Sequence, residues 1–250
     1  MTRRALVLDF DGVICDSIDE CFISSWTAYF GLYLERRPAY MPVSLRRDFA
    51  RMRPLVRGGE DFVLIQEILE KGGMVAGQED FDAMARQAGP DKLRNFHELF
   101  YKARTELLEN DRPSWLGLNR IYPHVVSAFQ HISPGAPVSI LSTKKPDFIA
   151  EILTAKGIRV PREKIRYSAR EKKLDIVAEV AEESGSGDAV FIDDQIDHLL
   201  GRSERPGELP RIEVFLATWG YVQDDWLREP LRVPIITPEE FVSLVRREYS

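Results

Sequence analysis

The sequence has little cysteine, no excess of positive charge and no long apolar run. Its two cysteines, Cys15 and Cys21, form neither a disulfide framework nor a metal-site spacing, so we expect buried thiols in a reducing compartment. A net charge of -6 disfavours a general nucleic-acid binder, which needs surplus Lys and Arg. No segment approaches the roughly 18 apolar residues of a membrane helix, and Asp9 and Asp11 interrupt the N-terminal apolar run, which is unlike a signal peptide. We therefore expect a cytoplasmic protein without a nucleic-acid or membrane partner.

Short apolar runs recur along the chain and alternate with helical patterns. The apolar runs, each of strand length, lie at 5–8, 136–142, 164–168, 188–193 and 212–218. Two helical patterns between them, 146–157 and 172–185, each close on a glycine, which is a common helix terminus. This alternation predicts an α/β fold with a doubly wound, Rossmann-like parallel sheet.

One long region departs from this alternation and reads as successive helices. Their expected ranges are 16–31, 43–56, 59–73, 79–89 and 90–110. Pro113 and Gly117 break the helical pattern, so we expect hinges around 12–17 and 112–120. The sequence therefore predicts two domains, an α/β core formed by 1–15 and 114–250 and an inserted helical domain formed by 16–113.

Polar side chains occupy the carboxyl ends of the predicted core strands. In chain order they are Asp9 and Asp11 after the first strand, Ser142 and Thr143 after the second, Lys172 and Lys173 at the helix after the third, and Asp193 and Asp194 after the fourth. Ligands bind at this edge of open α/β sheets, so we expect one shared site. A single acidic turn would be weak evidence, but this succession favours a functional site.

The residue types in this succession indicate phosphoryl transfer. Carboxylates at two strand ends suit Mg²⁺, whose charge lets neighbouring acids stay ionised. Asp9 is the expected nucleophile, which forms an aspartyl-phosphate, and Asp11 is the expected acid and base. The Ser142 hydroxyl and a lysine ammonium are expected to hold the phosphoryl oxygens, where charge accumulates in the transition state.

These motifs resemble the haloacid dehalogenase superfamily, in the branch with a helical cap inserted after the first motif, to which phosphoglycolate phosphatase and β-phosphoglucomutase belong. The matching segments cover most of the chain and read DFDGVICDS, IYPHVVSAF, ILSTKKPDF, KKLDIV, FIDDQIDHL and LATWGY. The resemblance implies a HAD-like core, a cap at 16–113 and a Mg²⁺-dependent hydrolase. The dehalogenases of the family lack the second acid of the first motif, so Asp11 argues for phosphoryl chemistry.

The resemblance also implies roles for the first two motifs. Asp9 matches the nucleophile, which is also a metal ligand. Asp11 matches the acid/base residue, whose backbone carbonyl is a further Mg²⁺ ligand. Ser142 matches the phosphate-binding hydroxyl, and Thr143, where many members have Asn, adjoins it in the predicted phosphate site.

The later motifs imply the remaining ligands. Asp194 matches the metal-binding acid, Asp193 beside it is expected to be a further metal ligand, and Asp197 is a rival acid. The family's catalytic and phosphate-binding lysine falls on Lys173 or Lys172. We favour Lys173, because the usual apolar positions then follow three and four residues later.

Substrate selection is expected in the cap, because in this family the cap closes over the core. An arginine-rich stretch there, residues 46–60, carries few acids. We expect Arg53 or Arg57, together with Glu60, to select a substrate with a second anionic or hydroxylated group. The competing interpretation is a solvated arginine face, the commoner outcome at such spacing.

The leading function is a Mg²⁺-dependent phosphatase that hydrolyses a small phosphorylated metabolite. One alternative is a phosphomutase of the β-phosphoglucomutase type, which uses the same core residues. Another is a non-catalytic protein that binds a phosphometabolite, although Asp9, Asp11 and the lysine motif are all present. The sequence indicates no oligomeric state.

Overall fold

The computed structural model describes residues 3–36, 43–75, 77–168, 172–200, 211–228 and 233–250. The chain divides into two compact units. We call Met1–Asp16 with Arg120–Ser250 the core unit, and Ser17–Asn119 the helical unit. No helix in the described ranges is long and apolar enough to cross a membrane.

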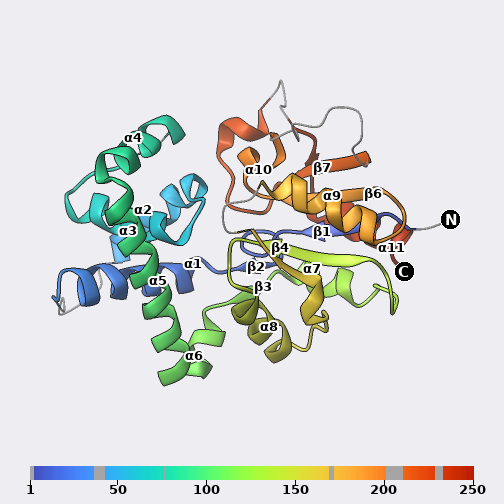
Figure 1. The fold of residues 1–250 in the computed structure, drawn as a ribbon, viewed down its shortest axis with the longest axis horizontal. Helices are drawn as coiled ribbons and strands as arrows, with labels where there is room; N and C mark the ends of the chain where they lie inside the picture. Colours follow the sequence, from blue (N-terminus) through green and yellow to red (C-terminus); the bar gives the residue numbers. More distant parts are fainter. Residues whose placement is uncertain (1–2, 37–42, 76, 169–171, 201–210, 229–232) are drawn as a thin grey trace. The chain divides into compact units, whose positions relative to one another are not determined.

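The core unit is built on a six-stranded parallel sheet (Figure 1), and its strand order is β5-β4-β1-β6-β7-β8. Its strands are β1 (Ala5–Leu8), β4 (Val138–Ser142), β5 (Ile165–Tyr167), β6 (Asp188–Asp193), β7 (Arg211–Ala217) and β8 (Ile235–Ile236). β1 pairs with β4 on one side and with β6 on the other. The parallel sheet predicted from the apolar runs is therefore confirmed, and the motifs on β1, β4 and β6 end on adjacent strands.

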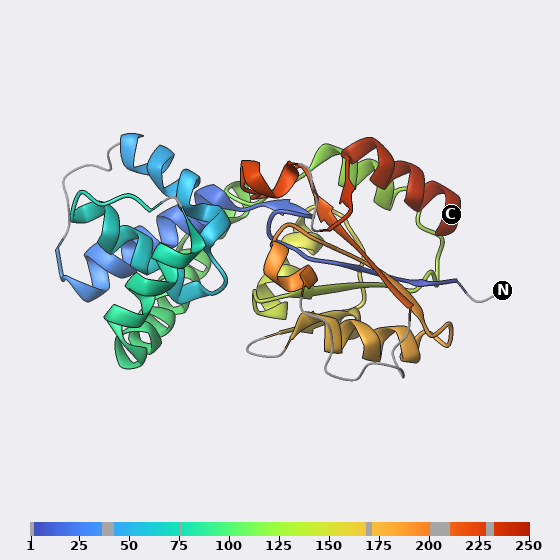
Figure 2. The same cartoon turned by 90° about the horizontal axis from the view of Figure 1, so that it is seen from above.

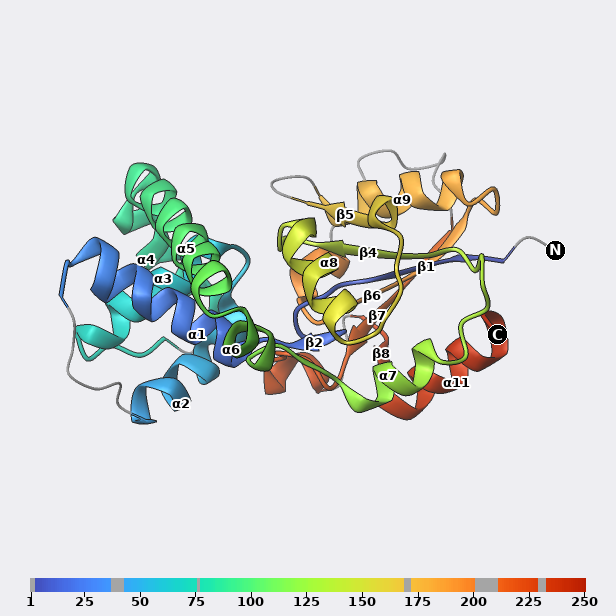
Figure 3. The ribbon, with the colours of Figure 1, turned by 90° about the horizontal axis from the view of Figure 1, so that it is seen from below.

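Helices cover both faces of this sheet. They are α7 (Pro123–Phe129), α8 (Pro146–Ala155), α9 (Lys173–Glu183), α10 (Ile196–Leu200) and α11 (Pro238–Glu248). α9 lies on one face, while α7 and α11 lie side by side over the other (Figure 2 and Figure 3). Leu174, Val177 and Ala181, spaced for one helix face, bury α9 against β1 and β6. The doubly wound architecture is confirmed.

The helical unit contains each helix expected from the sequence. Its α-helices are α1 (Ile18–Trp26), α2 (Val43–Met52), α3 (Gly59–Glu70), α4 (Gln78–Ala88), α5 (Pro90–Asn110) and α6 (Arg112–Gly117), with a π-helical turn η1 (Thr27–Tyr33) after α1 and a 3₁₀ turn η2 (Arg53–Leu55) after α2. α6 occupies the region expected to be a hinge. Pro113 lies in its first turn, where a proline is tolerated, and the Asp111 side chain caps it by accepting from the Ser114 N–H.

Two short strands, which the sequence pattern did not indicate, flank the insertion. β2 (Cys15–Asp16) pairs antiparallel with β3 (Arg120–Ile121). Two residues are too few to show an alternating pattern, so this pairing depends on the tertiary structure. The chain therefore leaves and re-enters the core unit through adjacent paired strands.

A buried ion pair joins α1 and α5 inside the helical unit. The Arg104 guanidinium donates to both carboxylate oxygens of Glu20, at 2.8 Å and 2.7 Å. The two side chains are 2% and 0% exposed. Ser24 donates to the same carboxylate, and the guanidinium lies 4.4 Å from the centroid of the Phe100 ring. Each of the two buried charges therefore has its counter-charge within the helical unit.

Replacing Arg104 with methionine is expected to destabilise the helical unit by about 3–5 kcal/mol, because Glu20 would remain buried without its counter-charge. Urea unfolding followed by circular dichroism measures this loss. Arg94→Met is the matched control, because Arg94 is an exposed arginine of the same helix whose partner is Asp91. A double variant, Glu20→Leu with Arg104→Met, should recover most of the lost stability; a single Arg104→Met variant as stable as wild type would contradict the assignment.

Candidate active site

Three buried carboxylates meet at the carboxyl edge of the core sheet. Asp9 follows β1 directly, Asp193 is the last residue of β6, and Asp194 comes next. One ligand atom from each lies within 4.8 Å of the others, and all three residues are buried. The backbone N–H of Asp9 donates to the Ile192 carbonyl at 2.9 Å, which ties the end of β1 to the end of β6. The adjacency of the two strands thus brings together acids that are far apart in the sequence.

Lys173 lies between two of these acids. It is the first residue of α9, and its side chain is 2% exposed. Its Nζ donates to Asp9 Oδ1 and to Asp193 Oδ2, in both cases at 2.8 Å. The neighbouring Lys172 is exposed. Of the two lysines left open by the sequence, Lys173 is therefore the one whose ammonium group lies between Asp9 and Asp193.

The Asp193 carboxylate is held by several donors from the core unit. Besides Lys173, Oδ2 contacts His198 Nδ1 at 3.1 Å, and Oδ1 accepts the Gln195 N–H at 2.9 Å. Asp193 is therefore fixed in one orientation by α9, by α10 and by the turn that follows β6.

Asp194 occupies a space that two glycines leave open. A Cβ at Gly12, whose φ is +95°, would lie 1.9 Å from Asp194 Oδ2, and a Cβ at Gly220 would lie 2.3 Å from the Asp194 Cβ. The Tyr221 N–H donates to Asp194 Oδ2 at 2.7 Å. The glycine of the first motif is thus required for close approach as well as for the left-handed turn.

Burial and neighbouring charges shift the pKa values of Asp9, Asp193 and Lys173 in different directions. Burial raises the pKa of Asp9, and Asp193 adds to this against the opposing effect of Lys173. Burial would also raise the pKa of Asp193, but Lys173 and His198 outweigh it and hold that pKa below its ordinary value. Burial would lower the pKa of Lys173, but Asp193 and Asp9 outweigh it, so the pKa is raised. The Asp9 carboxyl group is therefore harder to ionise than that of Asp193.

A second group lies at the carboxyl end of β4. Ser142 is buried, and its Oγ accepts the backbone N–H of Lys144 at 3.2 Å. Thr143 is half-buried. The Lys144 Nζ lies 2.8 Å from Asp11 Oδ1. The strand that ends in the predicted phosphate-binding hydroxyl thus also supplies an ammonium group to the predicted acid/base residue.

The charges and donors of the cluster fit a divalent cation. The carboxyl groups of Asp9, Asp193 and Asp194 gather here, with Asp11 paired to Lys144 nearby and Lys173 between Asp9 and Asp193. Hard carboxylate oxygens are the ligands that Mg²⁺ and Ca²⁺ take. The rival acid Asp197 lies exposed on α10 and is outside the cluster found among the described residues.

The three residues expected to select substrate all lie in the helical unit. The Arg53 side chain is buried, with its guanidinium 5.2 Å from the Phe62 ring centroid. Arg57 Nη1 forms an ion pair with Asp82 Oδ1 at 2.7 Å. Glu60 contacts His97 at 2.8 Å. Their role in substrate selection stays a prediction.

Among the described residues, sequence reasoning missed two titratable side chains that contact the predicted site, those of Lys144 and His198. Lys144 had a visible signal, because it is a cation two residues after Ser142 in the second motif. His198 had none, because a lone histidine without metal spacing is usually structural or exposed. Only the packing of α10 brings its ring to Asp193.

No family model matches the sequence, and no curated protein matches it. Solved structures match over nearly their whole lengths. A candidate phosphoglycolate phosphatase from Lactobacillus delbrueckii is 14% identical, with 98% of this chain and 99% of that chain covered and a TM-score of 0.60. A HAD family hydrolase from Deinococcus radiodurans, solved with bound phosphate and sodium, is 14% identical, with 99% and 96% covered and a TM-score of 0.53.

A third structure of the same fold carries a different name. Protein tyrosine kinase A of Mycobacterium tuberculosis is 13% identical, with 98% of this chain and 99% of that chain covered and a TM-score of 0.57. Identities at this level establish the architecture alone, and the functional argument has to come from the side chains of the site. The chain has the fold of the haloacid dehalogenase-like hydrolases, with a helical unit inserted between β2 and β3, as the sequence motifs indicated.

Proposed function

We propose that this protein is a Mg²⁺-dependent phosphatase that hydrolyses a small phosphorylated metabolite through an aspartyl-phosphate. The observation that carries the proposal is the buried cluster of Asp9, Asp193 and Asp194, with the Lys173 ammonium on Asp9 Oδ1 and Asp193 Oδ2. An acid at a strand end, a cation on it and further acids beside it are the groups that a carboxylate nucleophile needs for attack on phosphorus. The phosphatase and hydrolase names of proteins with this fold support the same reaction class.

The reaction has two displacements, and two residues divide the work. In the first, an Asp9 carboxylate oxygen bonds to phosphorus, the ester P–O bond breaks, and Asp11 gives its proton to the departing alkoxide oxygen. In the second, Asp11 takes a proton from water as the water oxygen bonds to the same phosphorus. The acyl-phosphate P–O bond then breaks, which releases inorganic phosphate and regenerates both carboxyl groups.

The charge on the transferring phosphoryl group requires nearby donors and cations. Lys173 and the hydroxyl groups of Ser142 and Thr143 would hold its equatorial oxygens. Asp9, Asp194 and the backbone carbonyl of Asp11 would hold Mg²⁺. Asp193, whose oxygens already accept from Lys173 and a backbone N–H, would serve this site mainly by orienting the lysine. When bound, Mg²⁺ supplies positive charge that keeps Asp9 ionised and neutralises the phosphoryl oxygens.

Substrate choice would come from the helical unit. Arg53, Arg57 and Glu60 are the residues proposed to recognise a second anionic or hydroxylated group of the substrate. Arginine suits this task because its planar guanidinium binds carboxylate or phosphate through two parallel hydrogen bonds.

Phosphate release from a broad panel of phosphorylated metabolites tests the proposal. We expect turnover of a subset of the panel with Mg²⁺, loss of that turnover with EDTA, and recovery when excess Mg²⁺ is added back. The expected dependence follows from the buried carboxylates of Asp9 and Asp194, whose oxygens are the kind of ligand that Mg²⁺ takes.

Other outcomes would replace the proposal. Turnover that EDTA leaves unchanged would contradict the metal-dependent mechanism. If no substrate of the panel releases phosphate, but a sugar phosphate is isomerised once a bisphosphate is added, the protein is the mutase. Saturable binding of a phosphometabolite without either reaction would indicate the non-catalytic alternative.

A further inference from the structure

The loop after β4 buries one lysine and exposes the next. The Lys144 side chain is 1% exposed, whereas Lys145 is exposed. A lysine in a loop ordinarily keeps its ammonium group in water, because removing the charge from water is costly unless a partner compensates for it. The burial of Lys144 therefore requires a specific counter-charge in the core unit.

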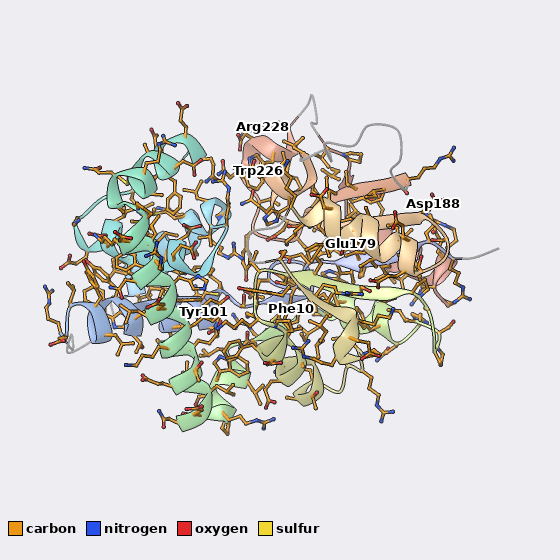
Figure 4. All side chains as sticks on the ribbon, viewed as in Figure 1. Phe10, Tyr101, Glu179, Asp188, Trp226 and Arg228 are labelled. Carbon is orange, nitrogen blue, oxygen red and sulfur yellow. The ribbon has the colours of Figure 1, made fainter. Side chains whose placement is uncertain are left out.

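That counter-charge is Asp11, the proposed acid/base residue. The Lys144 Nζ lies 2.8 Å from Asp11 Oδ1 and 5.4 Å from the centroid of the Phe10 ring. Phe10, labelled in Figure 4, is fully buried and comes two residues after the end of β1. Two consecutive residues of the first motif, an aromatic ring and a carboxylate, thus enclose the ammonium group.

The same lysine also contacts the predicted phosphate-binding hydroxyl. Its backbone N–H donates to Ser142 Oγ at 3.2 Å, while its side chain extends to Asp11. The Asp11 side chain is 14% exposed, in contrast to the more deeply buried Lys144. Lys144 therefore links the end of β4 to the carboxylate of the first motif. A change in its side chain would remove the contact that orients Asp11.

We propose that Lys144 is a positioning residue for proton transfer by Asp11. The ammonium group fixes the Asp11 carboxylate through Oδ1, so that the carboxyl group meets the ester oxygen of the substrate in one orientation. This inference rests on the proposed function, because it assigns Lys144 a part in the acid step of that reaction. The role differs from that of Lys173, which contacts Asp9 and Asp193.

The leaving group of the substrate tests this role. kcat/KM reports the steps up to the first irreversible one, which here is the transfer of the phosphoryl group to Asp9. In that step the leaving group of an alkyl phosphate needs a proton from Asp11. The leaving group of p-nitrophenyl phosphate is stable without a proton and needs Asp11 little. In Lys144→Met we expect kcat/KM for the best alkyl phosphate of the panel to fall at least about tenfold more than for p-nitrophenyl phosphate, with KM nearly unchanged. Lys144→Arg should recover part of the loss, and the matched control Lys145→Met should change neither substrate.

Two kinetic results would overturn the inference. An equal fall for both substrates would mean that Lys144 only supports the structure. A raised KM with an unchanged kcat would mean that its ammonium binds the phosphoryl group directly. In either case the proposed function would still stand if wild-type protein hydrolyses both esters and Asp9→Asn hydrolyses neither. Failure of the positioning role can therefore be told apart from failure of the proposed function.

A double-mutant cycle provides a readout that needs no activity. Urea midpoints are measured for wild type, Lys144→Met, Asp11→Asn and the double variant. We expect the double variant to lose clearly less than the sum of the two single losses, because each single change removes the same ion pair. Additive losses would overturn the contact and with it the positioning role. If wild-type protein releases no phosphate from any substrate, the proposed function and the positioning role both fail, and the cycle still reports on the ion pair.

Discussion

Replacing Asp9 with asparagine is expected to lower kcat/KM for phosphate release by at least about a thousandfold, because the amide cannot attack phosphorus. Asparagine has nearly the same shape as aspartate, so the loss would report chemistry and not a cavity. Steady-state phosphate release with Mg²⁺ measures the effect. Asp197→Asn is the matched control, because Asp197 is exposed on α10 and lies outside the acidic cluster of the described residues.

Covalent trapping separates loss of the nucleophile from loss of binding. Asp11→Asn keeps the nucleophile but lacks the base that activates water, so it should accumulate an adduct with an aryl phosphate that has a good leaving group. Intact mass after an acid quench should show one added phosphoryl group on Asp11→Asn and none on Asp9→Asn. Substantial turnover by Asp9→Asn, or an adduct on that variant, would exclude Asp9 as the nucleophile.

Replacing Lys173 with methionine is expected to lower kcat/KM by about 100- to 1,000-fold, the usual consequence of removing one preorganised donor from a transition-state charge. The change also removes the common counter-ion of Asp9 and Asp193, both of them buried. We therefore expect urea unfolding in EDTA to show a free energy of unfolding lower by about 3–5 kcal/mol than that of wild type. The loss should be smaller with Mg²⁺, because the ion replaces part of the missing charge.

Lys172→Met is the control for this variant, because Lys172 is exposed and adjoins Lys173 in the sequence. It should retain activity within about twofold of wild type and should leave the urea midpoint unchanged, as exposed substitutions usually do. If Lys172→Met were the damaging change and Lys173→Met the harmless one, the assignment of the active-site lysine would be reversed.

Local sequence pattern was enough for most of the fold. Apolar runs such as Val138–Ser142 and Asp188–Asp193 mark strands because a strand buried on both faces must be apolar along its length. The helices of the insertion were recognisable from their periodicity. The short elements were not: β2 and β3 have two residues each, and α6 was not expected because Pro113 and Gly117 are helix-breaking residues in other positions.

The sequence by itself determined which acids and which hydroxyl share one edge of the sheet. Asp9, Ser142 and Asp193 each stand at the carboxyl end of a strand, and parallel strands must bring those ends together whatever the details of packing.

Only the tertiary structure decided which neighbouring side chains turn inward. Successive residues at a helix start or in a loop point in different directions. The sequence favoured Lys173 over Lys172 through the apolar spacing of the helix alone, and it gave no ground for separating Lys144 from Lys145. Packing against the sheet buries one lysine of each pair against a carboxylate and leaves the other exposed. Burying a charged group without a partner would be too costly. Lys173 can therefore lie inside only because it pairs with Asp9, and Lys144 only because it pairs with Asp11.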